Sequence, residues 1–122
     1  MDHPIAYFEI PAQDLARLKG FYSELFGWRF EQSLQTADYM LIHPQPEHQG
    51  ICGGLARKMH PQHSVMNYVA VESVADHSEK VKRLGGQVVV PQTAVPRTGY
   101  FAVCLDPEGN PIGLWQEDAN AA

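Results

Sequence analysis

Near its C-terminus the chain reads Asp106-Pro107-Glu108-Gly109-Asn110-Pro111-Ile112-Gly113-Leu114-Trp115-Gln116, directly after an apolar run over 101–105. The turn chemistry is explicit. Pro107 fixes its own φ, and Gly109 and Asn110 tolerate positive φ. Asp106 can accept hydrogen bonds from nearby amides. With apolar residues on both sides, the stretch predicts a β-hairpin.

The first half of the chain has the pattern of one strand, one helix and three strands. Ile5 to Ile10 reads as a strand that Pro11 ends. Asp14 suits the N-cap of a helix whose apolar residues recur at helical spacing as far as Phe26. Gly27 ends this helix. Three more strands are predicted, beginning at Trp28 and over 39–43 and 51–57.

The second half repeats this order. A strand is predicted over 67–71, and Ser73 to Asp76 can cap a helix that Gly85-Gly86 ends. We expect the apolar face of that helix to carry Val74, His77, Val81 and Leu84. A strand over 88–90 and the hairpin follow. The halves share little sequence identity, so the repeat rests on element order. A ferredoxin-like α+β sandwich is the alternative, but roughly eight strands to two helices count against it.

Three anchors carry a resemblance to a known family: Asp14, the stretch Phe21-Tyr22-Ser23-Glu24-Leu25-Phe26-Gly27-Trp28, and the hairpin from Asp106. In this order and spacing the chain resembles the vicinal oxygen chelate superfamily, which includes glyoxalase I, extradiol dioxygenases and bleomycin-resistance proteins. The resemblance implies an α+β fold of two βαβββ modules whose sheets pack around a shared cavity. We predict one domain over 1–122, with modules over 4–58 and 64–118.

The resemblance also implies four metal-ligand positions, one on each of four strands. They fall on Tyr7, on the segment 52–55, on Met66 or Asn67, and on Gly113. A site for a divalent metal needs convergent nitrogen and oxygen donors, and these residues do not supply them. We therefore predict no metal and no other cofactor.

The composition and net charge of the chain indicate which partners and which location to expect. With 44% hydrophobic and 19% charged residues the chain is typical of a globular protein. Its net charge is −5, and the basic run Lys80-Val81-Lys82-Arg83 is short, so nucleic acid and membranes are not expected partners. The longest apolar runs fall far below membrane-spanning length, and the N-terminus lacks a secretion signal, so we expect a cytoplasmic location.

The histidines and cysteines do not form a recognisable site in the sequence. His60 and His63 flank Pro61 in the segment between the modules, and His43 and His48 flank a proline-rich loop. We interpret them as solvated loop residues, able at most to bind nickel or zinc adventitiously. Cys52 and Cys104 are interpreted as reduced thiols, since no basic neighbour in the sequence activates either as a nucleophile.

Strand alternation predicts the side chains that line the cavity. If Tyr7 points inward, then Glu9 also does, whereas Phe8 and Ile10 face the first helix. The same alternation is applied to the other strands, which are aligned with the superfamily as the resemblance implies. The predicted ligand-binding residues are then Tyr7, Glu9, Cys52, Met66, Tyr68, Gly113 and Trp115. Tyr39 or Leu41 is a further candidate, because the register is open. Gly53-Gly54 fits either close approach of a ligand to the backbone or a β-bulge.

Glu9 is the weak catalytic candidate among these residues. An unpaired buried carboxylate is costly, so Glu9 should have a raised pKa and either accept hydrogen bonds from Tyr7, Tyr68 or Arg97 or face solvent. We predict a metal-independent protein that binds or sequesters an aromatic or cationic small molecule, as a homodimer. The alternative is a glyoxalase-like lyase or isomerase that uses Glu9 or an unorthodox metal site.

Overall fold

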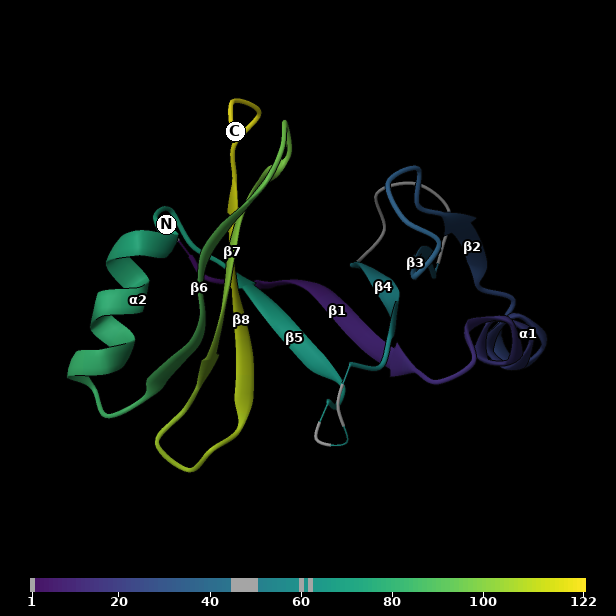
Figure 1. Ribbon diagram of the computed structural model, residues 1–122, viewed down its shortest axis with the longest axis horizontal. Coiled ribbons are helices and arrows are strands. Elements are labelled where there is room, and N and C mark those ends of the chain that lie inside the picture. The colour runs from purple at the N-terminus through teal and green to yellow at the C-terminus, as the bar shows by residue number, and fades with distance from the viewer. Residues whose placement is uncertain (1, 45–50, 60, 62) are drawn as a thin grey trace. The chain divides into compact units, whose positions relative to one another are not determined.

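The computed structural model describes residues 2–44, 51–59, 61 and 63–122 (Figure 1). His48 and His60 therefore lie outside the described residues. Within the described part the chain has a mixed α+β fold with eight strands and two helices, as the sequence predicts. The elements are β1 (Ile5–Ala12), α1 (Leu15–Phe26), β2 (Arg29–Gln32), β3 (Tyr39–His43), β4 (Cys52–Arg57), β5 (Met66–Ala70), α2 (Val74–Arg83), β6 (Gln87–Val95), β7 (Gly99–Leu105) and β8 (Pro111–Glu117).

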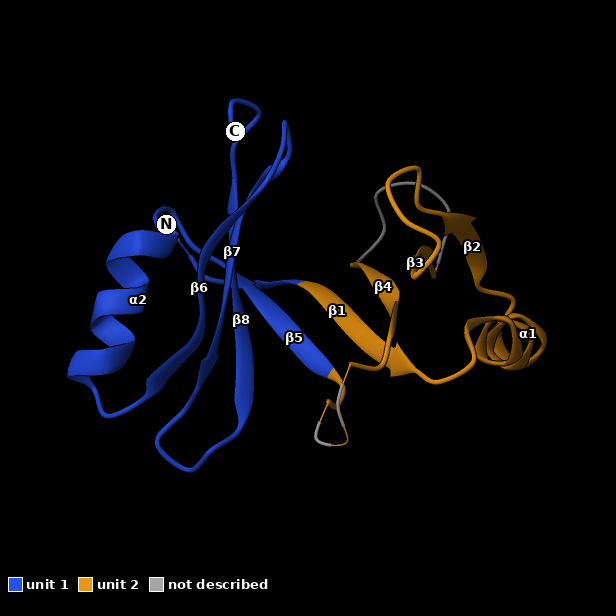
Figure 2. Cartoon of the chain, viewed as in Figure 1, with its two compact units in different colours: residues 1–6, 66–122 blue, residues 7–65 orange. Residues whose placement is uncertain are grey.

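The chain divides into two compact units (Figure 2). Unit 1 comprises residues 1–6 and 66–122, and unit 2 comprises residues 7–65. The N-terminal segment joins unit 1 because the Pro4 carbonyl accepts a hydrogen bond from the Ala70 amide at 2.9 Å. In addition, His3 Nδ1 donates to the Ala70 carbonyl at 3.0 Å. The module boundaries predicted from the sequence stay a prediction.

Unit 2 is a sheet with the strand order β2-β3-β4-β1, covered on one face by α1. Neighbouring strands run antiparallel except β4 and β1, which are parallel. Asp14 caps α1 by accepting a hydrogen bond from the Arg17 amide at 3.1 Å, and Gly27 ends it at a φ of 73°. The buried core under the helix consists of Ala12, Leu15, Ile42 and Leu55.

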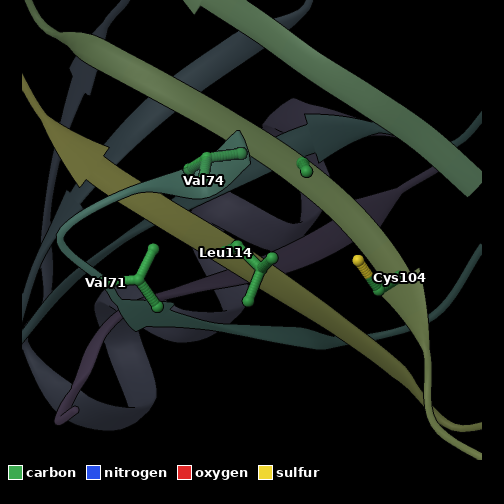
Figure 3. Packing of buried hydrophobic residues seen from close by; sticks show 5 residues of the cluster. Val71, Val74, Cys104 and Leu114 are labelled. Atoms are coloured by element: carbon green, nitrogen blue, oxygen red, sulfur yellow. The ribbon is translucent and has the colours of Figure 1, made fainter. Parts of the chain in front are cut away.

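Unit 1 is a sheet with the order β5-β8-β7-β6, and α2 packs against β6, β7 and β8 (Figure 1). Its buried core joins Val74 of the helix to the loop residue Val71 and to Ala102, Cys104 and Leu114 of the sheet (Figure 3). Ser73 caps α2, and Gln116 Oε1 accepts a hydrogen bond from the Val74 amide at 2.9 Å. A side chain of β8 thus satisfies an amide at the start of the helix.

The hairpin between β7 and β8 has the predicted turn. The Asp106 carboxylate accepts hydrogen bonds from the Asn110 side-chain amide and from the backbone amides of Asn110 and Glu108, all at 2.9 Å. These contacts, the Asn110 side chain first, hold the pKa of Asp106 below its ordinary value. Gly109 has a φ of 87°, whereas Asn110 does not use the positive φ that the sequence would allow.

One prediction for α2 is wrong. Leu84 was placed on the apolar face, but its side chain is 72% exposed. The helix ends at Arg83, and Leu84 is its C-cap, so helical periodicity no longer sets the direction of that side chain. Val74 and Val81 lie on the packed face as predicted. Neither described helix has the length and apolar character needed to cross a membrane.

Candidate functional site

The two faces of the unit 2 sheet carry different chemistry. Phe8 and Ile10 of β1 pack against the core under α1, as predicted. Their neighbours Tyr7 and Glu9 therefore point to the opposite face, away from the helix. Cys52 and Gly54 on β4 lie beside them, because Tyr7 is in register with Cys52 and Glu9 with Gly54. Three of the predicted ligand-binding residues, Tyr7, Glu9 and Cys52, thus share one sheet face.

Gly54 leaves the space in which this site is built. It lies between Glu9 and Leu41 in the strand registers. A Cβ at position 54 would lie 2.5 Å from Tyr7 Oη and would also overlap the Tyr39 hydroxyl. The missing side chain therefore lets two tyrosine hydroxyls meet over the strand. This explains Gly54 by close approach of side chains, a reason that the sequence alone did not supply.

A directed hydrogen-bond chain connects the polar groups. Tyr39 Oη donates to Glu9 Oε2 at 3.1 Å, and the hydroxyls of Tyr7 and Tyr39 are hydrogen-bonded to each other. A phenol has one proton to donate, so Tyr7 must donate to Tyr39 when Tyr39 donates to Glu9. The chain ends on a carboxylate for which no second hydrogen-bond donor is found within the described residues.

Burial sets the protonation of the three groups. Removal from water raises the pKa of Glu9, and the Tyr39 hydrogen bond offsets part of that rise. Burial also raises the pKa of Tyr7 to about 12, with a further contribution from the charge of Glu9. The pKa of Tyr39 rises for the same two reasons, burial first. At neutral pH both tyrosines therefore keep their protons, so that Tyr7 donates to Tyr39 and Tyr39 donates to Glu9, whose carboxyl group holds its proton more tightly than usual.

The pKa of Glu9 is raised, as predicted, and the structure gives Glu9 a hydrogen-bond partner that the sequence did not name for this role. Tyr39 donates the hydrogen bond. The sequence offered Tyr39 and Leu41 as equal candidates, and the structure assigns the contact to Tyr39. Alternation within 39–43 put both residues on one face. The strand register does not decide between them, because Leu41 pairs with Gly54, the partner of Glu9, whereas Tyr39 pairs with Ala56. The side-chain hydrogen bond shows that Tyr39 reaches Glu9.

The other predicted ligand-binding residues lie in unit 1. Gly113 and Trp115 of β8 point away from α2, since Ile112 and Leu114 pack on its core, as predicted. Tyr68 is in register with Gly113 and is 8% exposed, and Met66 is buried as well. The ring of Tyr68 contacts that of Phe101 edge to face, with centroids 6.5 Å apart. In unit 1 the predicted ligand-binding residues therefore form a largely buried, aromatic layer in which the Tyr68 ring lies against Gly113.

Two surface hollows lie elsewhere. One, of about 180 Å³, is lined by His3, Glu72, His77 and Lys80 in unit 1. The other, of about 340 Å³, is lined by Gln13, Lys58, Met59 and Pro61 in unit 2. Neither contains a predicted ligand-binding residue. The hydrogen-bonded face of unit 2 is the stronger candidate, because it combines a raised carboxylate pKa with convergent polar groups.

Comparison with known proteins decides the family. Residues 4–114 match the family model described as Glyoxalase/Bleomycin resistance protein/Dioxygenase superfamily. The chain belongs to this superfamily. The resemblance that the sequence anchors indicated is therefore confirmed, and the α+β fold is the glyoxalase/bleomycin-resistance fold.

Relatives in the superfamily are distant. CFP32 of Mycobacterium tuberculosis, which carries the provisional name glyoxylase, is 28% identical over 123 residues. That match covers 90% of this chain and 44% of CFP32, so the chain spans less than half the length of this relative. A superfamily member from Vibrio splendidus has a TM-score of 0.67 at 11% identity, covering 91% of this chain and 97% of that structure. The hypothetical protein BH1468 of Bacillus halodurans has a TM-score of 0.71 at 11% identity, covering 100% and 99%.

The residues at the metal positions of the superfamily do not fit a metal. Gly113 stands where the resemblance places a glutamate ligand, and the Tyr68 ring occupies the space above it. A Cβ at Gly113 would lie 2.5 Å from Tyr68 Cε2, so a glutamate would not fit without moving the ring. Among the residues placed by the structure, no cluster of three His, Cys, Asp or Glu side chains could hold a metal ion.

Proposed function

We propose that the protein binds a small organic molecule on the face of unit 2 that carries Tyr7, Glu9 and Tyr39, without a resident metal. The observation that carries this proposal is the Glu9 carboxylate, held partly out of water and hydrogen-bonded to Tyr39. A cationic group beside it would offset the desolvation that raises the Glu9 pKa. Tyrosine rings at its side suit flat and cationic molecules. The proposed activity is binding or sequestration of an aromatic or cationic ligand.

A matched pair of probes tests this proposal. N-methylquinolinium and quinoline have nearly the same shape, but only the first carries a permanent positive charge. We expect isothermal titration calorimetry on chelator-treated protein to give at least about tenfold tighter binding of N-methylquinolinium than of quinoline. Glu9→Gln should abolish that preference, because it removes the charge and keeps the shape.

Glu31→Gln is the control for a general effect of charge. By its pairing with Leu41, Glu31 lies on the same sheet face, but its side chain is 56% exposed and paired with His43. We expect this substitution to leave the preference within about twofold. Equal binding of the two probes, an unchanged preference in Glu9→Gln, or failure of both probes to bind would contradict the proposal.

A glyoxalase-like lyase or isomerase is the second candidate function. The raised pKa of Glu9 favours it, since a carboxyl group that holds its proton more tightly than usual is better suited to proton transfer near neutral pH. This function predicts turnover in a glyoxalase assay that falls at least about 100-fold in Glu9→Gln. The binding function predicts no turnover by a protein that still binds N-methylquinolinium.

Location and assembly are further proposals. We propose the cytoplasm, because Cys52 and Cys104 are both free thiols and disulfides form mainly in oxidising compartments. The homodimer that the sequence resemblance implies is likewise a proposal.

A further inference from the structure

Two histidines that are far apart in the sequence meet in unit 1 (Figure 2). His3 belongs to the N-terminal segment and His77 to α2, and the centroids of their rings are 5.1 Å apart. His3 is exposed and His77 is half-buried, so solvent reaches the pair. Together with Glu72 and Lys80 the two rings line the hollow of about 180 Å³. The pair is therefore a cluster of metal-binding side chains outside the candidate ligand site of unit 2.

Hydrogen bonds to the backbone fix which nitrogen of each ring carries the proton. His3 Nδ1 donates to the Ala70 carbonyl at 3.0 Å, and His77 Nδ1 donates to the Ser73 carbonyl at 3.2 Å. A carbonyl oxygen only accepts, so in the neutral rings the proton is on Nδ1 and the lone pair is on Nε2. Neither Nε2 has a hydrogen-bond partner within the described residues. Metal-binding histidines commonly have this arrangement, in which a carbonyl holds Nδ1–H and Nε2 is open.

The separation of the two rings suits a single zinc ion. Zinc prefers a tetrahedral arrangement with Zn–N distances of about 2.0–2.1 Å, which places the centroids of two imidazoles bound through Nε2 about 5.2 Å apart. The observed separation of 5.1 Å agrees with this requirement. The two rings can therefore bind one ion without moving closer together or further apart.

The charges around the pair do not exclude a cation. Glu72 brings a carboxylate to the hollow and Lys80 brings an ammonium group, so their charges offset one another. Among the residues that the structure describes, no third His, Cys, Asp or Glu side chain joins the two rings in a metal-binding group. Water must therefore fill the other positions around the ion, as it does in part at zinc sites with fewer than four protein ligands.

We propose that His3 and His77 bind one zinc ion through their Nε2 atoms. This site lies in unit 1 beside α2 and uses none of the four strand positions that the superfamily resemblance assigns to a metal. With only two protein ligands we expect a Kd in roughly the micromolar range, weaker than that of a four-ligand structural site. Because the ion joins the N-terminal segment to α2, zinc should also stabilise the folded chain.

Calorimetric titration of the chelator-treated full chain with zinc chloride tests the site. We expect His3→Ala and His77→Ala each to weaken zinc binding at least about tenfold, since a single imidazole remains. Zinc should raise the Tm of the original chain and leave that of His77→Ala unchanged. Circular dichroism shows whether each variant is folded.

His43→Ala is the matched control. His43 lies in unit 2, and its Nε2 is already hydrogen-bonded to Glu31 at 2.9 Å, so its loss should leave the Kd for zinc within about twofold. The double variant His60→Ala/His63→Ala removes the loop histidines that can bind zinc adventitiously. It should keep the zinc binding of the original chain.

Nitrogen-15 NMR of the imidazole rings identifies the atoms that bind the ion. We expect zinc to shift the Nε2 signals of His3 and His77, while Nδ1 of both rings keeps its proton. No zinc binding up to about 1 mM, binding that survives His77→Ala, or binding that is lost in His60→Ala/His63→Ala would overturn the proposal. A shift of Nδ1 in place of Nε2 would overturn it as well.

Discussion

The sheet faces turned away from the two helices show how one strand pattern can carry different chemistry. In unit 1 a buried tyrosine ring, that of Tyr68, covers Gly113. In unit 2 two tyrosine hydroxyls meet over Gly54 and one of them donates to Glu9. Both sheets use a glycine to admit a tyrosine from a neighbouring strand. The difference is that unit 1 seats the ring on the glycine, whereas unit 2 brings the hydroxyl to a carboxylate.

The largest effect on stability is expected from alanine at Gly113, and it should exceed the effect of alanine at Gly54. Gly113→Ala places a Cβ against the buried ring of Tyr68, which we expect to cost about 1–3 kcal/mol of unfolding free energy. Gly54→Ala meets the far end of the Tyr39 side chain, which can move. It should therefore cost less stability and instead break the contact with Glu9. Urea unfolding measures both, and an equal or larger loss in Gly54→Ala would reverse the comparison.

An intermediate effect is expected from the hydroxyl of Tyr39. Tyr39→Phe removes the hydrogen bond to Glu9 and the acceptor for Tyr7, which should cost about 1–2 kcal/mol in urea unfolding. It should also raise the pKa of Glu9 further, because that hydrogen bond lowers it.

Tyr100→Phe is the control for Tyr39→Phe in the other unit. The Tyr100 ring packs on the unit 1 core, and its hydroxyl makes no hydrogen bond in the part of the chain that the structure describes. Its loss should change the unfolding free energy by less than about 0.5 kcal/mol. An equal loss of unfolding free energy in Tyr39→Phe and Tyr100→Phe would show that the hydrogen bonds of the Tyr39 hydroxyl do not stabilise the fold.

The smallest effect should appear as a pH dependence of Glu9→Gln. Because folding raises the pKa of Glu9, the folded state binds its proton more tightly than the unfolded state does. The contribution of Glu9 to the free energy of unfolding is therefore fully present below the ordinary pKa of 4.5. It is lost as the pH rises through the pKa that Glu9 has in the folded protein. Glu9→Gln should therefore have the higher Tm at neutral pH. The difference should vanish as pH falls toward 4.5, and a difference that grows on acidification would contradict this assignment.

Much of the fold could be predicted because its signals are local. The caps Asp14 and Ser73, the glycine at 27 and the turn from Asp106 each act within a few residues of themselves. Strand parity also assigned Glu9 and Gly113 to the correct faces. The bond from Tyr39 to Glu9 could not be predicted, since it depends on the pairing of β3 with β4 and of β4 with β1. The prediction that Leu84 lies on the apolar helix face was wrong because Leu84 follows the last helical residue.

Carbon-13 NMR of the Glu9 carboxyl, followed through a pH titration with and without N-methylquinolinium, shows whether Glu9 forms the ligand site. We expect a pKa above 4.5 in the free protein, and a lower pKa when the cation is bound beside the carboxylate. A pKa at or below 4.5 in the free protein, or one that the cation does not change, would contradict the claim that Glu9 forms the ligand site.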